Sequence, residues 1–352
     1  MNSSFWKKKR VLLTGHTGFK GSWLSIWLHK LGSEVIGFSN SIPTEPSLYN
    51  LSKIRSDIVS INGDVRNLSS LQKIISEYRP QIVIHMAAQS LVNVSYNEPV
   101  ETYSTNVMGT VNLLESIRQS DDVSVIVNVT SDKCYKNKEF LKGYIENDEL
   151  GGYDPYSNSK ACSELITSSY RNSFFNQESN LKKHLASVRS GNIIGGGDWS
   201  KNRLIPDVMK SCLQDVSLKI RNPDAIRPWQ HVLDPLHGYL ILVEHLWNDG
   251  SDFSEAWNFG PDTDNLKPVS WIIDQMSNYW GKSIKWQKSE QNFHETNILS
   301  LNCLKAKSKL NWEPKLNLND SIKWTVDWFK AFSNNSNMRK FTEKQIDDFT
   351  LL

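Results

Sequence analysis

Through the first two-thirds of the chain, short runs of aliphatic and β-branched residues alternate with longer amphipathic stretches. The short runs predict strands at Val11–Thr14, Glu34–Phe38, Ile58–Asn62, Gln81–His85, Ser124–Val129 and His184–Arg189. The amphipathic stretches predict helices at Trp23–Leu31, Leu71–Tyr78, Met108–Gln119 and Ser157–Phe175. This alternation predicts an α/β fold with a parallel sheet, right-handed crossovers and helices on both faces. Functional residues are then expected beyond the carboxyl ends of the strands.

After Arg189 the regular alternation ends. Gly191–Trp199 has the composition of a loop, and Arg221–Asp234 mixes prolines with basic and aromatic residues. Leu266–Trp286 predicts a helix followed by an extended segment, and Leu316–Phe332 predicts an amphipathic helix. We interpret these segments as a smaller substrate-binding lobe.

The domain boundaries follow from this pattern. Residues 1–190 are expected to form a dinucleotide-binding domain, to which a segment near 232–260 returns, with a strand near Ala256–Gly260. Residues 191–231 and 261–335 form the second lobe. Residues 336–352 are polar, and we expect a poorly ordered C-terminal tail.

Composition excludes several classes of protein. The 352 residues suffice for one large domain and a smaller one. A net charge of +2 provides no field that would attract nucleic acid or a membrane surface, and no run reaches the ~18 apolar residues of a membrane helix. The four cysteines form no C-x-x-C pair, which argues against zinc and against a disulfide framework. We therefore expect a soluble, cytoplasmic protein without a metal.

A glycine-rich turn follows the first predicted strand and precedes the first predicted helix. In Thr14–Gly21 the glycines have the spacing G-x-x-G-x-x-G. Between a strand and a helix, such a turn lets backbone N–H groups and the helix N-terminus bind a pyrophosphate, because glycine has no Cβ to block its approach. The residues expected to bind a dinucleotide here are Gly15, Thr17, Gly18, Phe19 and Gly21.

Other strand ends extend the predicted cofactor site. Asp64 and Val65 follow the third strand, where a carboxylate can accept from an adenine amino group and a backbone N–H can reach a ring nitrogen. Ala87, Ala88 and Gln89 end the fourth strand, where small side chains let a dinucleotide lie against the backbone. The acidic residue that would bind the adenosine ribose and favour NAD is absent, because the second strand ends in Ser39-Asn40. The cofactor is expected to be NAD, and NADP stays open.

A tyrosine and a lysine are placed for acid–base chemistry. Tyr156 and Lys160 are four residues apart, so they lie on one face of a helix. A phenol of pKa about 10 needs a depression of roughly three units to act as a base at neutral pH, worth about 4 kcal/mol. A nearby ammonium and the positive charge of oxidised nicotinamide both lower that pKa. Ser131, at the end of the fifth strand, can share the same substrate hydroxyl.

Together these motifs resemble the extended short-chain dehydrogenase/reductase family along nearly the whole chain, with Asn106 in Thr105–Thr110 as a further matching cofactor residue. Within that family the chain is similar to the sugar-nucleotide 4,6-dehydratases that act on CDP-glucose. The runs that carry this closer resemblance are Thr14–Trp23, Thr130–Tyr135, Tyr153–Lys160, Gly195–Trp199 and Arg227–His231.

The resemblance implies a Rossmann-type doubly wound sheet, a hydro-lyase reaction and a role in making deoxysugars for bacterial O-antigen. It also implies a homodimer or homotetramer built on the helices at Met108–Gln119 and Ser157–Phe175.

Asp132 and Lys133 separate the possible reactions. A dehydrogenase or a 4-epimerase needs only Ser131, Tyr156 and Lys160, whereas removal of water also needs a base for the C5 proton and an acid for the C6 hydroxyl. The resemblance implies that Lys133 is that base and Asp132 that acid. A neutral lysine and a protonated aspartate require pKa shifts in opposite directions.

The second lobe is expected to bind the nucleotide part of the substrate. The resemblance places Asn192, Arg203 and Arg227 at the diphosphate or ribose, where guanidinium and amide donors suit phosphates. Gln89, Ser90 and Arg189 are expected to line the sugar pocket. The preference for cytidine rests on resemblance alone. Another sugar-nucleotide dehydratase, a 4-epimerase or reductase, and a cofactor-binding protein without catalysis stay open as alternatives.

Overall fold

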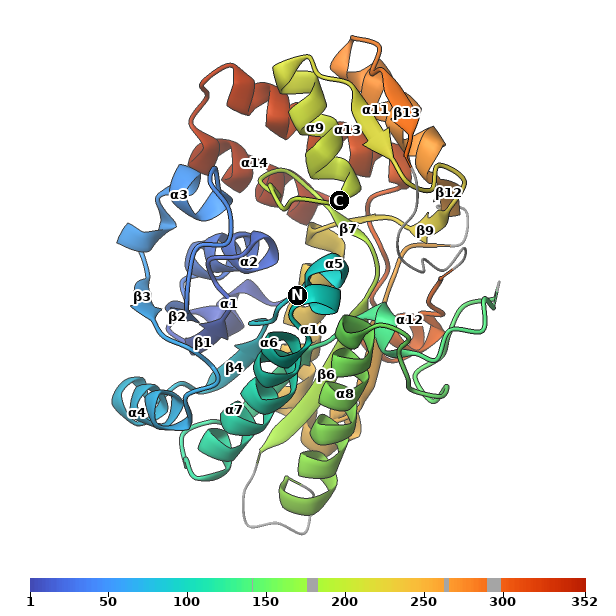
Figure 1. The fold of residues 1–352 in the computed structure, drawn as a ribbon. Coiled ribbons are helices and arrows are strands. Elements are labelled where there is room, and N and C mark those ends of the chain that lie inside the picture. The colour runs from blue at the N-terminus through green and yellow to red at the C-terminus, as the bar shows by residue number, and fades with distance from the viewer. Residues whose placement is uncertain (141, 176–182, 263–265, 290–298) are drawn as a thin grey trace.

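A seven-stranded parallel sheet forms the centre of the molecule (Figure 1). The computed structural model describes residues 1–140, 142–175, 183–262, 266–289 and 299–352. The strand order is β11-β6-β5-β4-β1-β2-β3, and every pairing is parallel. The strands are β1 (Arg10–Thr14), β2 (Glu34–Ser39), β3 (Val59–Asn62), β4 (Ile82–His85), β5 (Val125–Val129), β6 (His184–Ser190) and β11 (Ala256–Phe259). The predicted parallel α/β sheet is confirmed, and the strand expected near Ala256–Gly260 is its edge strand β11.

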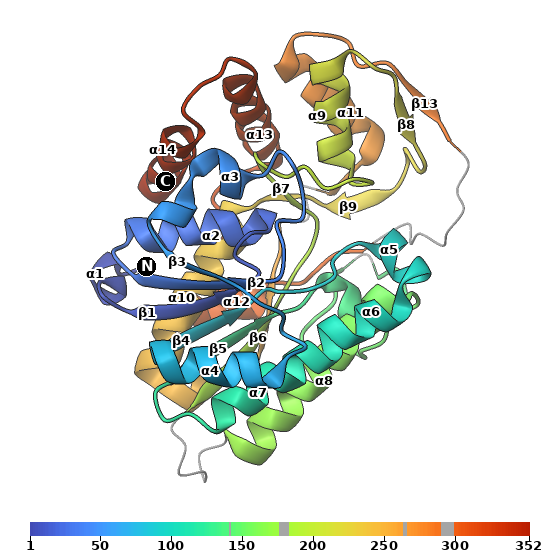
Figure 2. The same cartoon turned by 60° about the vertical axis from the view of Figure 1, so that its left-hand side comes forward.

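Helices cover both faces of the sheet (Figure 2). On one face lie α2 (Phe19–Lys30) and α10 (Leu233–Asp249), and on the other α4 (Leu68–Tyr78), α7 (Gly109–Arg118) and α8 (Pro155–Phe174). Alternate strand residues serve the two layers, since Val11 and Leu13 pack with one core and Leu12 with the other. None of the helices in the described chain is both long and apolar enough to cross a bilayer.

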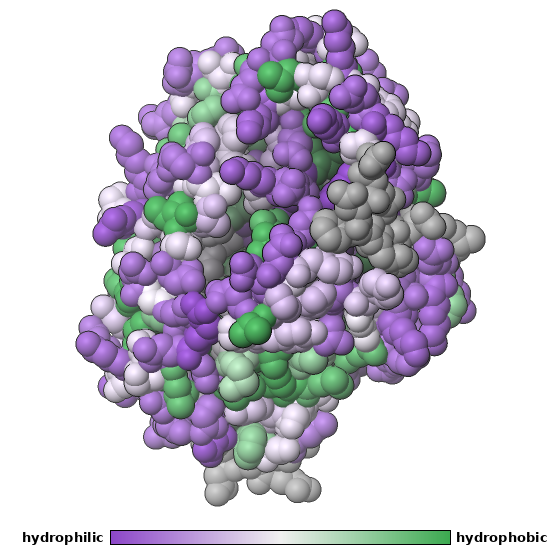
Figure 3. All heavy atoms as spheres, viewed as in Figure 1, coloured by the Kyte–Doolittle hydropathy of each residue, from purple (hydrophilic) through white to green (hydrophobic). Residues whose placement is uncertain are grey.

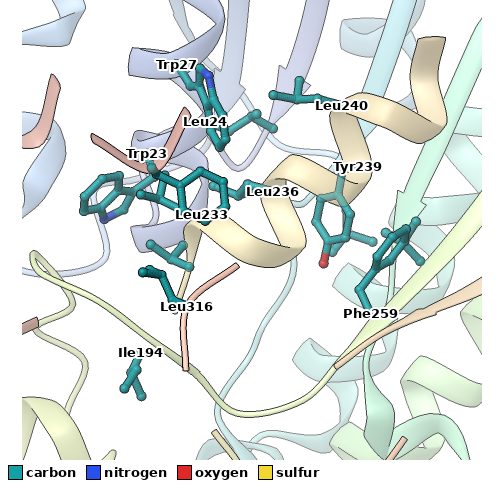
Figure 4. Close-up of a cluster of buried hydrophobic side chains, with 14 of the residues drawn as sticks. Trp23, Leu24, Trp27, Ile194, Leu233, Leu236, Tyr239, Leu240, Phe259 and Leu316 are labelled. Carbon is teal, nitrogen blue, oxygen red and sulfur yellow. The ribbon is translucent and has the colours of Figure 1, made fainter. Parts of the chain in front are cut away.

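Large side chains tie α2 to α10 (Figure 4). Trp23, Leu24 and Trp27 of α2 lie beside Leu233 and Leu236 of α10, and all are at most 1% exposed. Since α2 begins at Phe19, within the glycine-rich segment Thr14–Gly21, this packing holds that segment in place. The helix starts at Phe19, four residues before the predicted start, because Gly18 is its N-cap.

A second lobe stands above the carboxyl ends of the strands (Figures 1 and 2). It contains α9 (Leu204–Gln214), α11 (Val269–Trp280) and α13 (Leu318–Ser333). Its described strand pairs are β7 (Ile193–Ile194) with β10 (Gln230–His231), β9 (Ile226–Pro228) with β12 (Leu266–Pro268), and β8 (Leu218–Ile220) with β13 (Trp286–Lys288). The helix predicted within Leu266–Trp286 is α11, and the one predicted at Leu316–Phe332 is α13.

Short elements complete the described chain. They are α1 (Ser3–Trp6), α3 (Leu48–Ser52), α5 (Val92–Asn97), α6 (Pro99–Tyr103) and α12 (Leu304–Leu310), with 3₁₀ turns at Ile54–Ser56, Asp132–Cys134 and Gly250–Phe253 and a π turn at Ser104–Met108. The Asp132–Cys134 turn carries two of the expected catalytic residues.

The C-terminal residues are ordered, so the expectation of a poorly ordered tail is wrong. Helix α14 (Met338–Leu351) packs on α2 and α3. Its Met338, Ile346 and Phe349 are buried, and the Phe349 ring meets Trp27 at 5.8 Å between centroids. These apolar residues recur at helical spacing within an otherwise polar segment. Each buried side chain of this size contributes ~1.5–3 kcal/mol, which is enough to order the helix.

Candidate active site

A cleft of about 1800 Å³ lies between the sheet and the second lobe. The glycine turn, the residues that follow β4, β5 and β6, and the N-terminus of α8 line one side. Residues around α9 and β9 line the other side. The cleft therefore lies where the parallel order of the strands predicts a site.

Each glycine of the turn has its own steric reason. Gly15 has φ +75°, and a Cβ there would lie 2.7 Å from the Ala87 nitrogen. A Cβ on Gly21 would lie 2.1 Å from the Gly15 oxygen. At Gly18 a Cβ would meet only the Gly15 oxygen, at 3.4 Å, so this residue leaves space toward the cleft. Open space beside a helix N-terminus fits a cofactor pyrophosphate.

Thr14 joins this turn to the next strand end. Its Oγ1 accepts from the N–H groups of Met86 and Ala87, at 3.1 Å each, and pairs with His85 Nδ1 at 2.7 Å. Ala87 and Ala88 line the cleft, as expected. Sequence reasoning did not single out Thr14, although a hydroxyl at a strand end is a recognisable signal for such a clamp.

On the other side of β1 from His85, beyond the end of β3, Asp64 already has partners. Both of its oxygens accept from Arg66, at 2.5–3.0 Å, and Asn40 also bonds to it. The hydrogen bond from Arg66 is the main reason that the Asp64 pKa lies below its ordinary value, and burial opposes it. Thr17 donates to the Ser41 carbonyl at 2.6 Å, and the Val65 carbonyl accepts from Asn112. Asp64 and Val65 line the cleft, and their binding of adenine stays a prediction.

Asn106 lies behind the cleft wall and positions Gln89. Its Oδ1 accepts from the Gln89 N–H and its Nδ2 donates to the Gln89 carbonyl, both at 2.9 Å. It also donates to Ser159 of α8 at 2.9 Å and is only 2% exposed. Gln89 lines the cleft, whereas Asn106 supports it from behind.

The expected catalytic residues converge at the start of α8. Asp154 caps the helix by accepting from the Ser157 N–H at 2.9 Å. Tyr156 lies on the first turn, 8% exposed, and hydrogen-bonds to Ser131. One turn later the Lys160 ammonium donates to the Val129 carbonyl at 3.2 Å. Tyr156, Ser131 and Lys160 thus line one part of the cleft.

The Tyr156 phenol does not have the lowered pKa that the sequence predicts for a base. Burial raises the Tyr156 pKa, and Lys133, the Ser131 hydrogen bond and Arg203 oppose it without cancelling it. Burial lowers the Lys160 pKa to about 8, although Glu164 acts to raise it. The cation that acts most on the phenol is therefore Lys133 and not Lys160. The predicted depression of the phenol pKa is not reached by the protein's own groups.

Asp132 and Lys133 form an ion pair. The Lys133 ammonium lies 3.2 Å from Asp132 Oδ1, which also accepts from Ser131 Oγ at 3.0 Å. The Lys133 side chain is 32% exposed and lines the cleft, whereas Asp132 is fully buried. Asp132 Oδ2 is buried without a partner among the described residues. The pair links Ser131 to the surface of the cleft.

Arginines of the second lobe face the strand ends. Arg203 binds Asp198 at 3.3 Å and donates to Ser90 at 3.0 Å, so it spans from the second lobe to the loop after β4. Arg227 and Asn192 line the same cleft. These four expected substrate residues, with Gln89, are brought together as predicted from the sequence.

Arg189 is the exception among the expected substrate residues. Its guanidinium is 3% exposed and donates to Glu164 at 2.8 Å, to Tyr135 at 2.7 Å and to the Glu146 carbonyl at 2.9 Å. Glu164 also accepts from Thr130 and Ser187. The position of Arg189 in β6 did not by itself show which way its side chain points. In the structure the side chain lies in this buried network and does not line the cleft.

Loss of this buried pair should cost much stability. Arg189→Met leaves Glu164 charged and buried, so we expect the free energy of unfolding to fall by about 3–5 kcal/mol in urea titrations. Lys323→Met, which breaks the exposed pair with Asp327, should cost at most about 0.5 kcal/mol. A loss under 1 kcal/mol for Arg189→Met would contradict the structural role of the pair.

Sequence reasoning also missed Lys20, the sixth residue after the first strand's Thr14. Its ammonium lies inside the cleft and donates to Tyr239 at 3.0 Å and Ser190 at 3.4 Å. A lysine between the last two glycines of the turn was the available signal. No group of His, Cys, Asp and Glu suited to a metal occurs among the residues that the structure describes, and all four cysteines are free.

Comparison with known proteins gives extensive matches. Residues 12–325 match the family model described as GDP-mannose 4,6 dehydratase. The chain is 48% identical to CDP-glucose 4,6-dehydratase of Salmonella typhimurium, over 99% of this chain and 98% of that protein.

Among solved structures, dTDP-glucose 4,6-dehydratase of Bacillus anthracis in complex with NAD has a TM-score of 0.76 at 23% identity, over 94% and 99% of the two chains. UDP-glucose-4-epimerase of Stenotrophomonas maltophila, with bound NAD and formylated UDP-arabinopyranose, has a TM-score of 0.82 at 19% identity, over 93% and 100%. These two structures share the Rossmann-like fold of this chain.

Proposed function

The chain belongs to the GDP-mannose 4,6-dehydratase family, and we propose that it converts CDP-glucose to CDP-4-keto-6-deoxy-glucose and water. The resemblance to sugar-nucleotide dehydratases stated from the sequence is confirmed by these matches. The observation that carries the proposal is the Asp132–Lys133 ion pair beside Ser131 and Tyr156, in a cleft that also holds a dinucleotide cradle. The 48% identity to a CDP-glucose 4,6-dehydratase supports the same reaction.

NAD is the proposed cofactor. The residues that would hold it are Gly15, Gly18 and Phe19 at the pyrophosphate, Asp64 at the adenosine end and Ala87 along the middle. The steric requirements at Gly15 and Gly21, and the open space at Gly18, fit such a group. When bound, NAD would accept a hydride from the sugar and later return it.

Tyr156 is proposed to remove the proton of the C4 hydroxyl. Ser131, which bonds to the same phenol, would orient that hydroxyl. Because burial keeps the Tyr156 pKa above its ordinary value, proton removal at neutral pH needs further positive charge. The oxidised nicotinamide would add one such charge, and Lys133 and Arg203 already act in the same direction.

Asp132 and Lys133 are proposed to eliminate water. The 4-ketone acidifies C5–H, Lys133 takes that proton and Asp132 gives one to the C6 hydroxyl, which leaves as water. These roles require neutral Lys133 and protonated Asp132. The ion pair reaches this protonation state when one proton passes from Lys133 Nζ to Asp132 Oδ1, which lie 3.2 Å apart. Asp132 is fully buried and does not line the cleft, so its contact with the sugar requires a rearrangement of the groups around it.

The second lobe is proposed to hold the diphosphate and ribose. Arg203, Arg227 and Asn192 provide two guanidinium groups and one amide on that side of the cleft. Guanidinium groups bind phosphate oxygens in two-pronged fashion, which fixes the sugar relative to Tyr156. Gln89 and Ser90 are proposed to contact the sugar.

The protein is proposed to act as a homodimer or homotetramer in the cytoplasm, in deoxysugar synthesis for O-antigen. Apolar side chains gather on the face over α6 and α8 in Figure 3. Val100 of α6, Met108 of the π turn before α7 and Leu165 of α8 are 81%, 50% and 59% exposed. Exposed apolar residues of this size on adjoining helices favour a protein–protein interface.

Incubation of the purified protein with NAD and each of four substrates, CDP-, UDP-, dTDP- and GDP-glucose, tests the proposal. We expect a 4-keto-6-deoxy product from CDP-glucose, at a kcat/KM at least tenfold above the others. A galactose epimer would replace the proposal with a 4-epimerase. Absence of any product would favour a cofactor-binding protein without catalysis.

A further inference from the structure

Lys20 places a positive charge inside the cofactor cradle. It is the second residue of α2, and its ammonium donates to Tyr239 at 3.0 Å and Ser190 at 3.4 Å. The same ammonium lies 5.0 Å from the centre of the Tyr239 ring. Tyr239 and Ser190 also bond to each other at 2.8 Å and are buried, so the side chain has a defined position.

The sheet order tells which half of the dinucleotide this charge faces. The glycine turn follows β1, the adenosine side follows β2 and β3, and the opposite half lies over β4, β5 and β6. Ser190 ends β6, so the Lys20 side chain runs away from Asp64 and toward the catalytic residues. Its charge acts on Lys160, Arg203 and Asp132, which agrees with this placement.

No ion pair neutralises Lys20 within the described part of the chain. Its hydrogen-bond partners are hydroxyl groups, and no described carboxylate lies within 4 Å of its ammonium. Burial, then Lys160 and Arg203, lower the Lys20 pKa to about 7. The diphosphates of the cofactor and of the substrate would favour its charged form.

We propose that the Lys20 ammonium favours the reduced nicotinamide over the oxidised one, so that the cleft retains the hydride between its removal from C4 and its return to C6. The oxidised ring carries one positive charge and becomes neutral when it accepts a hydride, so a nearby cation disfavours only the oxidised form. This purpose rests on the proposed dehydratase activity. The electrostatic effect itself does not.

Binding of three ligands to the purified protein tests the proposal without turnover. We expect Lys20→Met to lower the ratio of the NAD⁺ and NADH dissociation constants about tenfold, while the affinity for ADP-ribose, which lacks the nicotinamide, stays within twofold. Lys20→Arg should keep the wild-type ratio. Lys201→Met removes an exposed lysine at the rim of the same cleft and should also keep it.

Three results would overturn the proposal. Equal weakening of all three ligands in Lys20→Met would show that Lys20 binds the pyrophosphate. An unchanged ratio would show that its charge does not reach the ring, and failure of the wild-type protein to bind either dinucleotide would remove the cofactor altogether. The outcome is separate from the substrate test. A shifted ratio in a protein that does not turn over CDP-glucose would retain the electrostatic role and refute the dehydratase.

Discussion

Tyr156→Phe is expected to lower kcat with CDP-glucose by about 10²–10⁴-fold, because it removes the proposed base and keeps the ring. The phenol is buried against Ser131, and phenylalanine fills the same space, so folding and NAD affinity should change little. Without a group to take the C4 hydroxyl proton, hydride transfer from C4 stops as well. Stopped-flow absorbance of reduced nicotinamide, with steady-state assay of the 4-keto product, measures both effects.

A second tyrosine of α8 provides the control. Tyr170 lies near the other end of that helix, and its hydroxyl pairs with Glu115 at 3.5 Å. Tyr170→Phe removes the same oxygen far from the cleft, and kcat should stay within about twofold. If Tyr156→Phe turned over at the wild-type rate, Tyr156 would not be the base and the assignment of this cleft as the catalytic site would be wrong.

Lys133→Met is expected to stop elimination while C4 oxidation continues. Loss of the C5 base should lower formation of the 4-keto-6-deoxy product by about 10²–10⁴-fold. Reduced nicotinamide should then accumulate to a level near that of enzyme sites. In deuterated water, the wild-type product should carry deuterium derived from solvent, whereas the sugar recovered from the variant should keep its C5 proton.

The same variant should also change the pH dependence of the first step. The Lys133 charge lowers the Tyr156 pKa, so its removal raises that pKa further. Since the ionised phenol is the active form, the rise of the oxidation rate with pH should move to higher pH in Lys133→Met. Lys133→Arg keeps the charge and should keep the wild-type position of that limb. Full turnover in Lys133→Met would remove Lys133 from the elimination.

Several features could be predicted from local sequence because local chemistry decides them. The glycine turn was recognisable since Gly15 and Gly21 allow no Cβ. The strands of the sheet were recognisable because burial on both faces requires continuous apolar runs. Tyr156 and Lys160 were placed together because helical spacing alone puts them on one face.

Other features depend on partners far away in the chain. Arg189 was expected at the sugar, but Glu164 and Tyr135 take its guanidinium. The C-terminal segment was expected to be poorly ordered, yet Trp27 of α2 provides the surface on which Phe349 is buried. None of these partners can be read from the residue's own neighbours.

The sequence by itself determined the parallel α/β sheet and the glycine-rich turn, and it selected Ser131, Tyr156 and Lys160 as candidate acid–base residues, since each follows from spacing and from local backbone chemistry. Only the tertiary structure decided which charged groups face the cleft. Whether Arg189, Lys20 or Asp132 meets a ligand depends on the direction of one side chain and on the partners packed around it. For Arg189 and Lys20 those partners come from strands and helices distant in the chain.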